Sequence, residues 1–210
     1  MIAQYNTIIT KVRYTPPAAA YGTGSNYTIL TTPGGAHDYL ILDPNAGTFS
    51  WSTDFAEAET NANQHFPNTE GIDVHNRILN FISKSRKKLY TLDLAAGTYT
   101  TSSTRSGTGP GTFDLQPDQL ARIIGEHDIL YFCEDGGSDC DIHGRDATGQ
   151  YFTIVRGDGH DTENSGLAFS PDNRHMYFSM QETSNIYDVW REDGLPFNGA
   201  VAATKYHSDG

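Results

Sequence analysis

Acidic side chains recur at a regular interval along this chain of 210 residues. Glu70, Asp118 and Glu163 each precede a short apolar stretch, and the intervals between them are 48 and 45 residues. If these stretches are the innermost strands of a repeated sheet, one carboxylate per repeat points at a common axis. Crowded carboxylates repel one another, and a bound cation, typically Ca²⁺ with its several oxygen ligands, relieves the repulsion. The regular spacing of the three acids therefore predicts a metal site, although each acid alone is explained equally well as a turn cap.

A second group of acids stands between Phe132 and Asp141. Glu134 and Asp135 end a predicted strand that should reach the same mouth, so we predict both as further metal ligands. Asp139 and Asp141 are interpreted instead as part of an acidic loop. The spacing in this segment matches neither a zinc ribbon nor an EF-hand loop.

The same segment contains the two cysteines of the chain. Cys133 and Cys140 lie seven positions apart across a glycine-rich loop. They could form a disulfide that closes a hairpin, or both could be free thiols.

Histidines carry a weaker signal. No pair of the eight has the i, i+4 spacing of a helical metal site, and most are expected on the surface. His37, which follows two glycines, is a weak candidate for binding a substrate. The sequence also lacks a nucleophile elbow and a glycine-rich phosphate loop, so a serine hydrolase has no support.

A repeat positions these residues. An Asp-containing turn with glycine, followed by an aromatic residue, occurs four times, and the turn glycines are Gly47, Gly97, Gly149 and Gly194. Intervals of 45 to 52 residues with several short strands are typical of a β-propeller, one blade per repeat. We predict an all-β protein, a single propeller domain over residues 1–210. Four four-stranded blades are expected at about 1–54, 66–104, 114–157 and 160–200. Six or seven blades are commoner than four, which indicates part of a larger ring.

Composition narrows the classes of function. The net charge is −12, which argues against nucleic acid as a partner because a phosphate-binding face must be basic. No apolar stretch approaches the roughly 20 residues that cross a bilayer, and the start of the chain does not read as a signal peptide. The basic run 84–88 is interpreted as a solvated turn. No long segment with helical periodicity is evident, so strands dominate the prediction.

Several motifs together resemble those of a known family, the PhoX-type alkaline phosphatases, and in particular its divergent eukaryotic microbial members. The motifs, in the same order, are Asn68–His75, Gln116–Leu120, Tyr131–Gly137 and Gly166–Asp172. The resemblance spans most of the chain from about Glu70 onward. It implies the later part of a six-bladed, secreted propeller that hydrolyses a small phosphorylated substrate, with calcium and iron ions in the channel mouth.

The resemblance also implies roles for individual residues, with departures. Glu70 and Asp118 would be metal ligands, and Glu163 a further candidate. Where the family has a phosphate-binding arginine this chain has Asn68, and Cys133 does not match the family's metal-bridging cysteine. Three functions remain open: a metal-dependent phosphomonoesterase, a non-catalytic calcium-binding propeller whose active site has decayed, and a lactonase-like enzyme with one divalent cation. Missing blades, or another chain, would close the ring.

Overall fold

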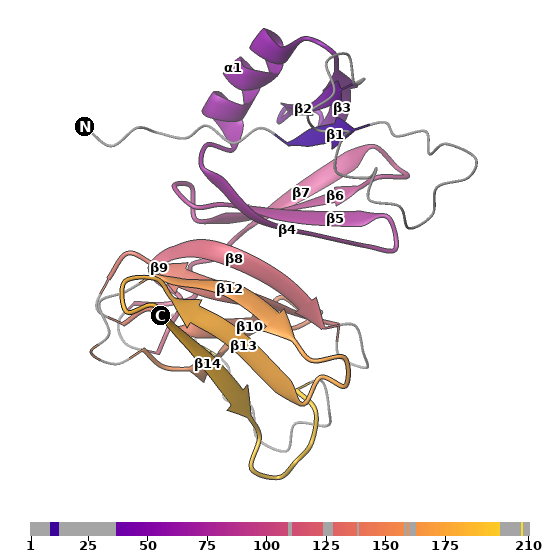
Figure 1. Ribbon diagram of the computed structural model, residues 1–210. Coiled ribbons are helices and arrows are strands. Elements are labelled where there is room, and N and C mark those ends of the chain that lie inside the picture. The colour runs from indigo at the N-terminus through magenta and orange to yellow at the C-terminus, as the bar shows by residue number, and fades with distance from the viewer. Residues whose placement is uncertain are drawn as a thin grey trace, which may run out of the picture.

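The computed structural model describes residues 9–12, 37–108, 111–123, 128–137, 139–157, 159, 163–197 and 207. These residues form antiparallel sheets and one helix, which confirms the all-β propeller prediction (Figure 1). Each strand of a blade pairs with the next strand in the chain. Two repeats have the expected four strands, and within the described residues the other two have three each. A strand predicted at residues 27–30 lies outside the described residues.

Three blades lie in succession along the chain. The second blade contains β4 (Thr69–His75), β5 (Ile78–Ser83), β6 (Lys88–Asp93) and β7 (Thr98–Ser103). The third blade contains β8 (Gln116–Ile123), β9 (Ile129–Asp135), β10 (Ile142–Arg145) and β11 (Tyr151–Val155). The fourth blade contains β12 (Asn164–Phe169), β13 (His175–Met180) and β14 (Asn185–Trp190). Their first strands, β4, β8 and β12, lie side by side and are called the inner strands below (Figure 1).

The first repeat contains β1 (Thr10–Val12), β2 (His37–Asp43) and β3 (Thr48–Ser52), and it is attached differently. Its strand β3 meets β7, the outer strand of the second blade, so that one sheet runs β1-β2-β3-β7-β6-β5-β4. The two turn cassettes join through equivalent residues: Phe49 N donates to Gly97 O at 3.0 Å, and Tyr99 N donates to Gly47 O at 2.9 Å. Two copies of one hairpin thus pair edge to edge.

The turns of these cassettes explain their sequence. The Asp93 carboxylate accepts hydrogen bonds from Ala95 N and Ala96 N, both at 2.9 Å, and Asp43 does the same in the first cassette. Gly97 follows with φ +70°, a left-handed conformation that favours glycine. The conserved spacing of Asp and Gly within the chain is therefore local turn chemistry.

One helix, α1 (Phe55–His65), was not predicted from the sequence. Asp54 caps its N-terminus by accepting from Ala56 N and Glu57 N, which satisfies N–H groups that a helix leaves unpaired. The Asn61 side chain then bonds both Leu42 N and Leu42 O at 2.9 Å, which fastens the helix to β2. This helix is too short to cross a bilayer, and no other helix occurs within the described residues.

The hydrophobic cores lie between neighbouring blades, and the inner strands of these blades are in contact. Tyr131 and Phe178 are buried in the cluster shared by the third and fourth blades. Phe132 and Ile82 belong to the cluster between the second and third blades. Because a blade is covered on both faces, β9 is buried at six consecutive positions from Ile129 to Glu134 rather than at alternate ones.

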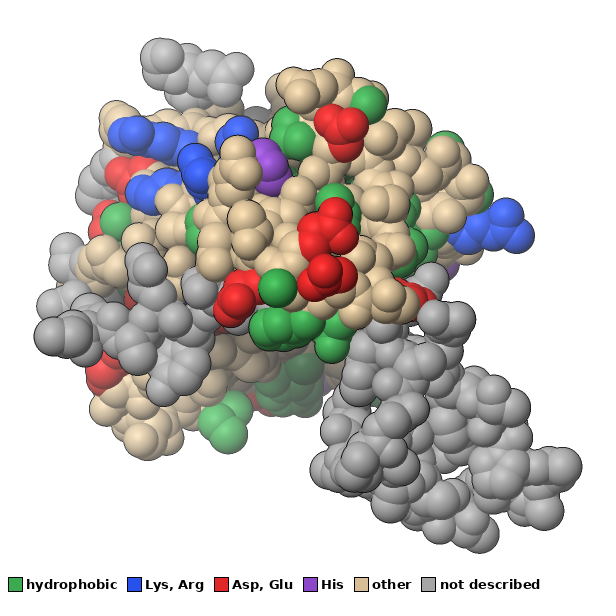
Figure 2. Space-filling view, turned by 90° about the horizontal axis from the view of Figure 1, so that it is seen from above, with side chains coloured by type: hydrophobic (Ala, Val, Ile, Leu, Met, Phe, Trp, Pro, Cys, Tyr) green, Lys and Arg blue, Asp and Glu red, His purple; other side chains and the backbone are tan. Residues whose placement is uncertain are grey.

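A surface hollow of about 360 Å³ lies away from the inner strands. It is lined by residues that include His65, Arg86 and Lys88, and none of the lining residues is among the predicted site residues. On the face of the molecule that carries α1, most of the basic side chains gather on one side, beside a histidine, and another basic side chain lies at the opposite edge (Figure 2). The hollow is therefore separate from the predicted metal site.

Candidate metal site at the inner strands

The three inner strands share a distortion at the same place. Each has one extra residue relative to its partner strand, a β-bulge, and the bulged pairs are Glu70–Gly71, Asp118–Gln119 and Gly166–Leu167. Asp118 follows Glu70 by 48 residues, and Gly166 follows Asp118 by another 48. Bulges bend a strand and redirect its side chains, and they are common beside functional sites. The structural equivalent of the first two acids in the fourth blade is therefore Gly166 and not Glu163.

The inner strands approach closely at this level. A Cβ placed on Gly71 would lie 2.2 Å from Leu120 N, so only glycine allows β4 to rest on the backbone of β8 here. Glu70 and Asp118, one residue before and two residues before these contact points, are brought to the same end of the two strands. Local bulges and one glycine thus position the acids.

The acids from three blades meet at this end. Oxygens of Asp118, Asp135 and Glu163 lie within 4.8 Å of one another. Glu163 stands just before β12 and reaches the group from that position. Glu70 is near enough for the Asp118 charge to act on it. We call Glu70, Asp118, Asp135 and Glu163 the acidic cluster. The structure therefore brings together Asp118, Asp135 and Glu163 of the five predicted metal ligands, with Glu70 nearby.

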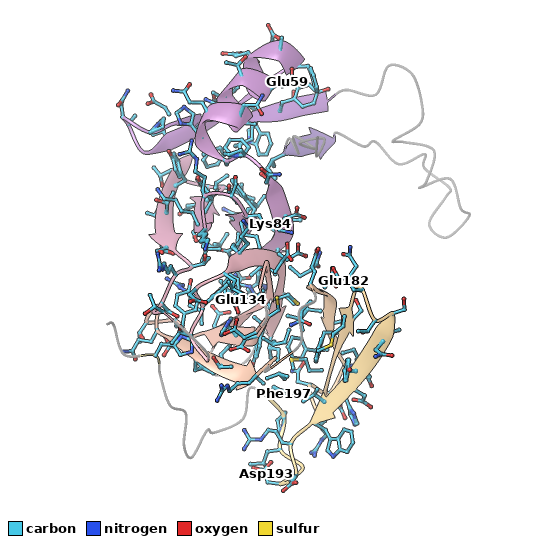
Figure 3. The ribbon with its side chains drawn as sticks, turned by 90° about the vertical axis from the view of Figure 1, so that its left-hand side faces the viewer. Glu59, Lys84, Glu134, Glu182, Asp193 and Phe197 are labelled. Carbon is cyan, nitrogen blue, oxygen red and sulfur yellow. The ribbon has the colours of Figure 1, made fainter. Side chains whose placement is uncertain are left out.

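A lysine lies at the centre of the acidic cluster. Lys84 Nζ is 2.8 Å from Asp118 Oδ2, 2.5 Å from Asp135 Oδ2 and 3.7 Å from Glu163 Oε1. Its side chain is only 16% exposed, and it lies where the second blade meets the third (Figure 3). The prediction of a solvated basic turn was wrong for this residue. Residue 84 does open a turn, but its side chain bends back towards the strand ends.

Three carboxylates lie around one ammonium here, so the lysine does not balance the charge of the cluster. Burial raises the pKa of Glu163 to about 7, and the hydrogen bond with Asp118 and its charge add to the effect. Burial and the Asp118 charge also raise the pKa of Glu70. The ammonium of Lys84 is stabilised, because its bonds to Asp118 and Asp135 raise its pKa in spite of burial. The acidic cluster is thus short of positive charge.

Glu134 does not belong to the acidic cluster, contrary to the prediction. It precedes Asp135 in β9, and consecutive side chains of a strand point to opposite faces. Glu134 Oε1 accepts from Asp114 N at 3.0 Å and Leu115 N at 2.8 Å, inside the third blade. Figure 3 shows Glu134 well apart from the labelled lysine. Its visible role is to hold the loop that leads into β8.

Two residues expected at the surface lie beside Glu134 instead. Asp141 and His143 are both buried, with 1% and 0% of their surface exposed. His143 Nε2 is 3.0 Å from Glu134 Oε2. Sequence reasoning missed both because their burial depends on how the β9–β10 hairpin folds around them. The sequence did carry one signal, the alternation of side chains along a strand. His143 lies two residues after Asp141, so the two side chains are expected on the same face.

The remaining residues considered for the site, Asn68, His37 and the two cysteines, do not form a common group. Asn68 is a turn residue with φ +50°, two positions before Glu70, and its carbonyl accepts from Lys84 N. His37 lies in β2, and four strands separate β2 from β4 in the sheet. Cys133 and Cys140 are both free, buried thiols, and burial raises the pKa of Cys140 to about 11. Neither a disulfide nor a reactive thiolate is present in this arrangement.

The comparisons with known proteins assign no family to this chain. No family model and no curated protein matches the chain. Among solved structures, the chain is similar to regucalcin, a calcium-binding protein from Agrobacterium tumefaciens, with a TM-score of 0.36 and 15% sequence identity. The match covers 67% of this chain and 59% of the regucalcin chain, so this chain spans less than two thirds of that protein. The blades themselves define a protein of the β-propeller class.

Proposed function

We propose that this chain is a cation-binding β-propeller module whose site is the acidic cluster at the inner strands. The observation that carries the proposal is the imbalance of charge: Asp118, Asp135 and Glu163 lie around one ammonium, Lys84. Glu70 is near enough for the charges of this group to act on it. Like charges that are crowded in a partly buried place repel strongly, and a bound divalent cation would neutralise them.

Calcium suits this donor set better than iron. The candidate ligands are all carboxylate oxygens, and Ca²⁺ takes six to eight oxygen ligands in flexible geometry. The thiol of Cys133 is fully buried, and burial raises its pKa well above the usual range, so it is a poor metal ligand at neutral pH. The iron that the PhoX-type resemblance implies has no soft ligand in this cluster.

Lys84 makes the expected affinity modest. The ammonium lies where a metal ion would bind, so Ca²⁺ must displace it and break its contacts with Asp118 and Asp135. We expect a dissociation constant of about 10⁻⁴–10⁻³ M, the range of extracellular calcium modules. Such a site would be filled outside the cell, which agrees with the secreted location that the resemblance implies.

Hydrolysis of phosphate monoesters is the finer proposal, and it depends on the motif resemblance. A metal ion bound to the acids would polarise a phosphoryl oxygen. Among the residues that the structure describes, Lys84 has its cationic group at the acids, so it would contact a second phosphate oxygen. Asn68 offers only a neutral amide where the family has an arginine. The non-catalytic alternative therefore differs in turnover and not in metal binding.

Calorimetric titration of the full chain with Ca²⁺ tests the proposal. Asp118→Asn should abolish binding, because it removes a ligand from the centre of the cluster. Lys84→Met should strengthen binding at least about tenfold, because it removes the competing charge and keeps the length of the side chain. Asp188→Asn, at the surface of β14, is the matched control and should bind as the wild type does.

The outcomes separate the two levels of the proposal. No Ca²⁺ binding in either the wild type or Lys84→Met would rule out the cation site. Binding without chelator-sensitive hydrolysis of p-nitrophenyl phosphate would rule out the phosphatase and leave the cation-binding module. Turnover that is lost in Asp118→Asn would support both.

A further inference from the structure

A second group of potential ligands lies on the other side of β9, inside the third blade. One ligand atom from each of Glu134, Asp141 and His143 lies within 4.8 Å of the others, and all three residues are buried. Glu134 is the penultimate residue of β9, Asp141 immediately precedes β10, and His143 is in β10. The β9–β10 hairpin therefore supplies the whole group, which is separate from the acidic cluster.

The hydrogen bonds around His143 determine which ring nitrogen carries the proton. Thr153 Oγ1 donates to Gly111 O at 3.0 Å, so its own proton is in use. The contact of 3.0 Å between Thr153 Oγ1 and His143 Nδ1 then requires Nδ1–H as the donor. The other ring nitrogen, Nε2, faces Glu134 and Asp141.

The rest of this network agrees with the same assignment. Ser106 Oγ accepts from Phe113 N at 3.1 Å and lies 2.5 Å from His207 Nδ1, to which it can donate. His207 Nε2–H then donates to Thr153 Oγ1 at 2.8 Å. Thr153 thus accepts two N–H groups and donates once, using its full capacity.

Two buried atoms of the group have no hydrogen-bond partner. His143 Nε2 is 3.0 Å from Glu134 Oε2, but the two are not aligned for a hydrogen bond. Asp141 Oδ2 also has no hydrogen-bond partner, whereas Asp141 Oδ1 accepts from Gly157 N at 2.7 Å. Burying a polar atom without a hydrogen-bond partner costs free energy, so both atoms are unfavourable as they stand.

We propose that Glu134, Asp141 and His143 bind one divalent transition-metal ion, Zn²⁺ or a close relative such as Co²⁺, in a buried structural site. A doubly charged ion would neutralise the two carboxylates and would give both unpartnered atoms a partner. One imidazole nitrogen with carboxylate oxygens suits such metals, whereas Ca²⁺ prefers oxygen alone.

Neighbouring groups already orient these ligands as a metal site requires. Glu134 accepts three backbone N–H groups, from Asp114, Leu115 and Asp141, which hold its carboxylate in place. The His143 ring stacks on Phe113 at 4.5 Å and donates through Nδ1 to Thr153. Metal-binding histidines almost always donate their other N–H to such a partner. The site would clamp the hairpin loop rather than bind a substrate.

Metal analysis of the full chain tests this site. After expression with Zn²⁺ and dialysis against metal-free buffer, the wild type should retain one equivalent of metal. Asp141→Asn should lose it while keeping the oxygen that accepts from Gly157. His143→Gln should lose it too, and Thr153→Val should weaken Co²⁺ binding about 10–100-fold, because it removes the partner of Nδ1.

Two control variants distinguish this site from the acidic cluster and from general damage. Asp118→Asn should lose Ca²⁺ binding but retain Zn²⁺, and His175→Gln, at the surface of β13, should retain both. X-ray absorption of the bound Zn²⁺ should show one imidazole ligand. Retention of the metal in Asp141→Asn and His143→Gln, or no retained metal in the wild type, would overturn the proposal. Asp141→Asn keeps the loop contact, so it remains informative if His143→Gln does not fold.

Discussion

The second and third blades use the same two positions for different purposes. Ser83 pairs with Thr69 as Glu134 pairs with Pro117, just before the bulge of each inner strand. The next residues, Lys84 and Asp135, are therefore equivalent too. In both blades the first position points into the blade and the second points to the acidic cluster.

The residue at the inward position forms hydrogen bonds with the loop that enters the inner strand. It is a donor in the second blade and an acceptor in the third. Ser83 donates to Pro67 O, whereas Glu134 accepts from Asp114 N and Leu115 N. The outward position carries a cation in the second blade and an anion in the third, and these two make a salt bridge. Equivalent backbone sites thus divide structural and ligand-binding roles between adjacent residues.

The largest expected effect tests the inward position. Glu134→Ala should destabilise the fold by about 4 kcal/mol, because three backbone N–H groups and His143 lose a buried charged partner. Ser83→Ala should cost about 1 kcal/mol, the value of one neutral hydrogen bond. Urea unfolding of both variants measures the difference.

Equal losses in these two variants would contradict the division of roles between the blades. Glu134→Gln serves as the control if the alanine variant does not fold. It keeps the size of the side chain and one accepting oxygen, so an intermediate loss is expected.

A smaller effect is expected where the two inner strands touch. Gly71→Ala should cost about 3 kcal/mol, because its Cβ would lie 2.2 Å from Leu120 N, which belongs to the backbone and cannot rotate away. Gln119 occupies the equivalent bulge position in β8, and Gln119→Ala is the matched control, with a loss below about 1 kcal/mol. Thermal unfolding of the two variants measures the loss of stability from this contact between β4 and β8. An equally large loss in Gln119→Ala would show that the bulge is sensitive to substitution and that the contact is not the cause.

The parts of the fold that local chemistry determines could be predicted from the sequence. The turn of Asp93 and Gly97 needs only its own residues, so its recurrence located the blades and their strands. The phase of Glu70 and Asp118 was equally readable, because equivalent bulges lie 48 residues apart. The helix α1 also had a signal that was overlooked, the N-cap Asp54 with helix-forming alanine and glutamate after it.

The parts that depend on contacts between distant residues could not be read from the sequence. Lys84 stands in a basic run, and only the position of the third blade shows that its side chain turns towards Asp118 and Asp135. The edge pairing of Phe49 with Gly97 joins two hairpins whose turn glycines are 50 residues apart, and no local pattern predicts it. The opposite directions of Glu134 and Asp135 did have a signal, the period of two along a strand.

The smallest expected effect is a dependence of stability on pH, and it concerns the fourth blade's contribution to the acidic cluster. The pKa of Glu163 is raised from its ordinary value of 4.5 to about 7, chiefly by burial and then by Asp118. The folded chain therefore holds a proton that the unfolded chain releases between these two values. Stability from this group is fully present below about pH 4.5 and is lost as the pH rises through about 7, by about 1–2 kcal/mol after allowance for solvent. Urea unfolding of the wild type and Glu163→Gln at several pH values measures the loss as the difference between them.

Glutamine mimics the protonated acid, so the stability of the variant should lack this dependence on pH. The variant should therefore exceed the wild type in stability most clearly above pH 7. Added Ca²⁺ should reduce that gain if the acidic cluster binds it, since the ion compensates the charge that the proton otherwise removes. A difference between the two proteins that stays constant from pH 4 to 8 would mean that Lys84 alone balances the cluster.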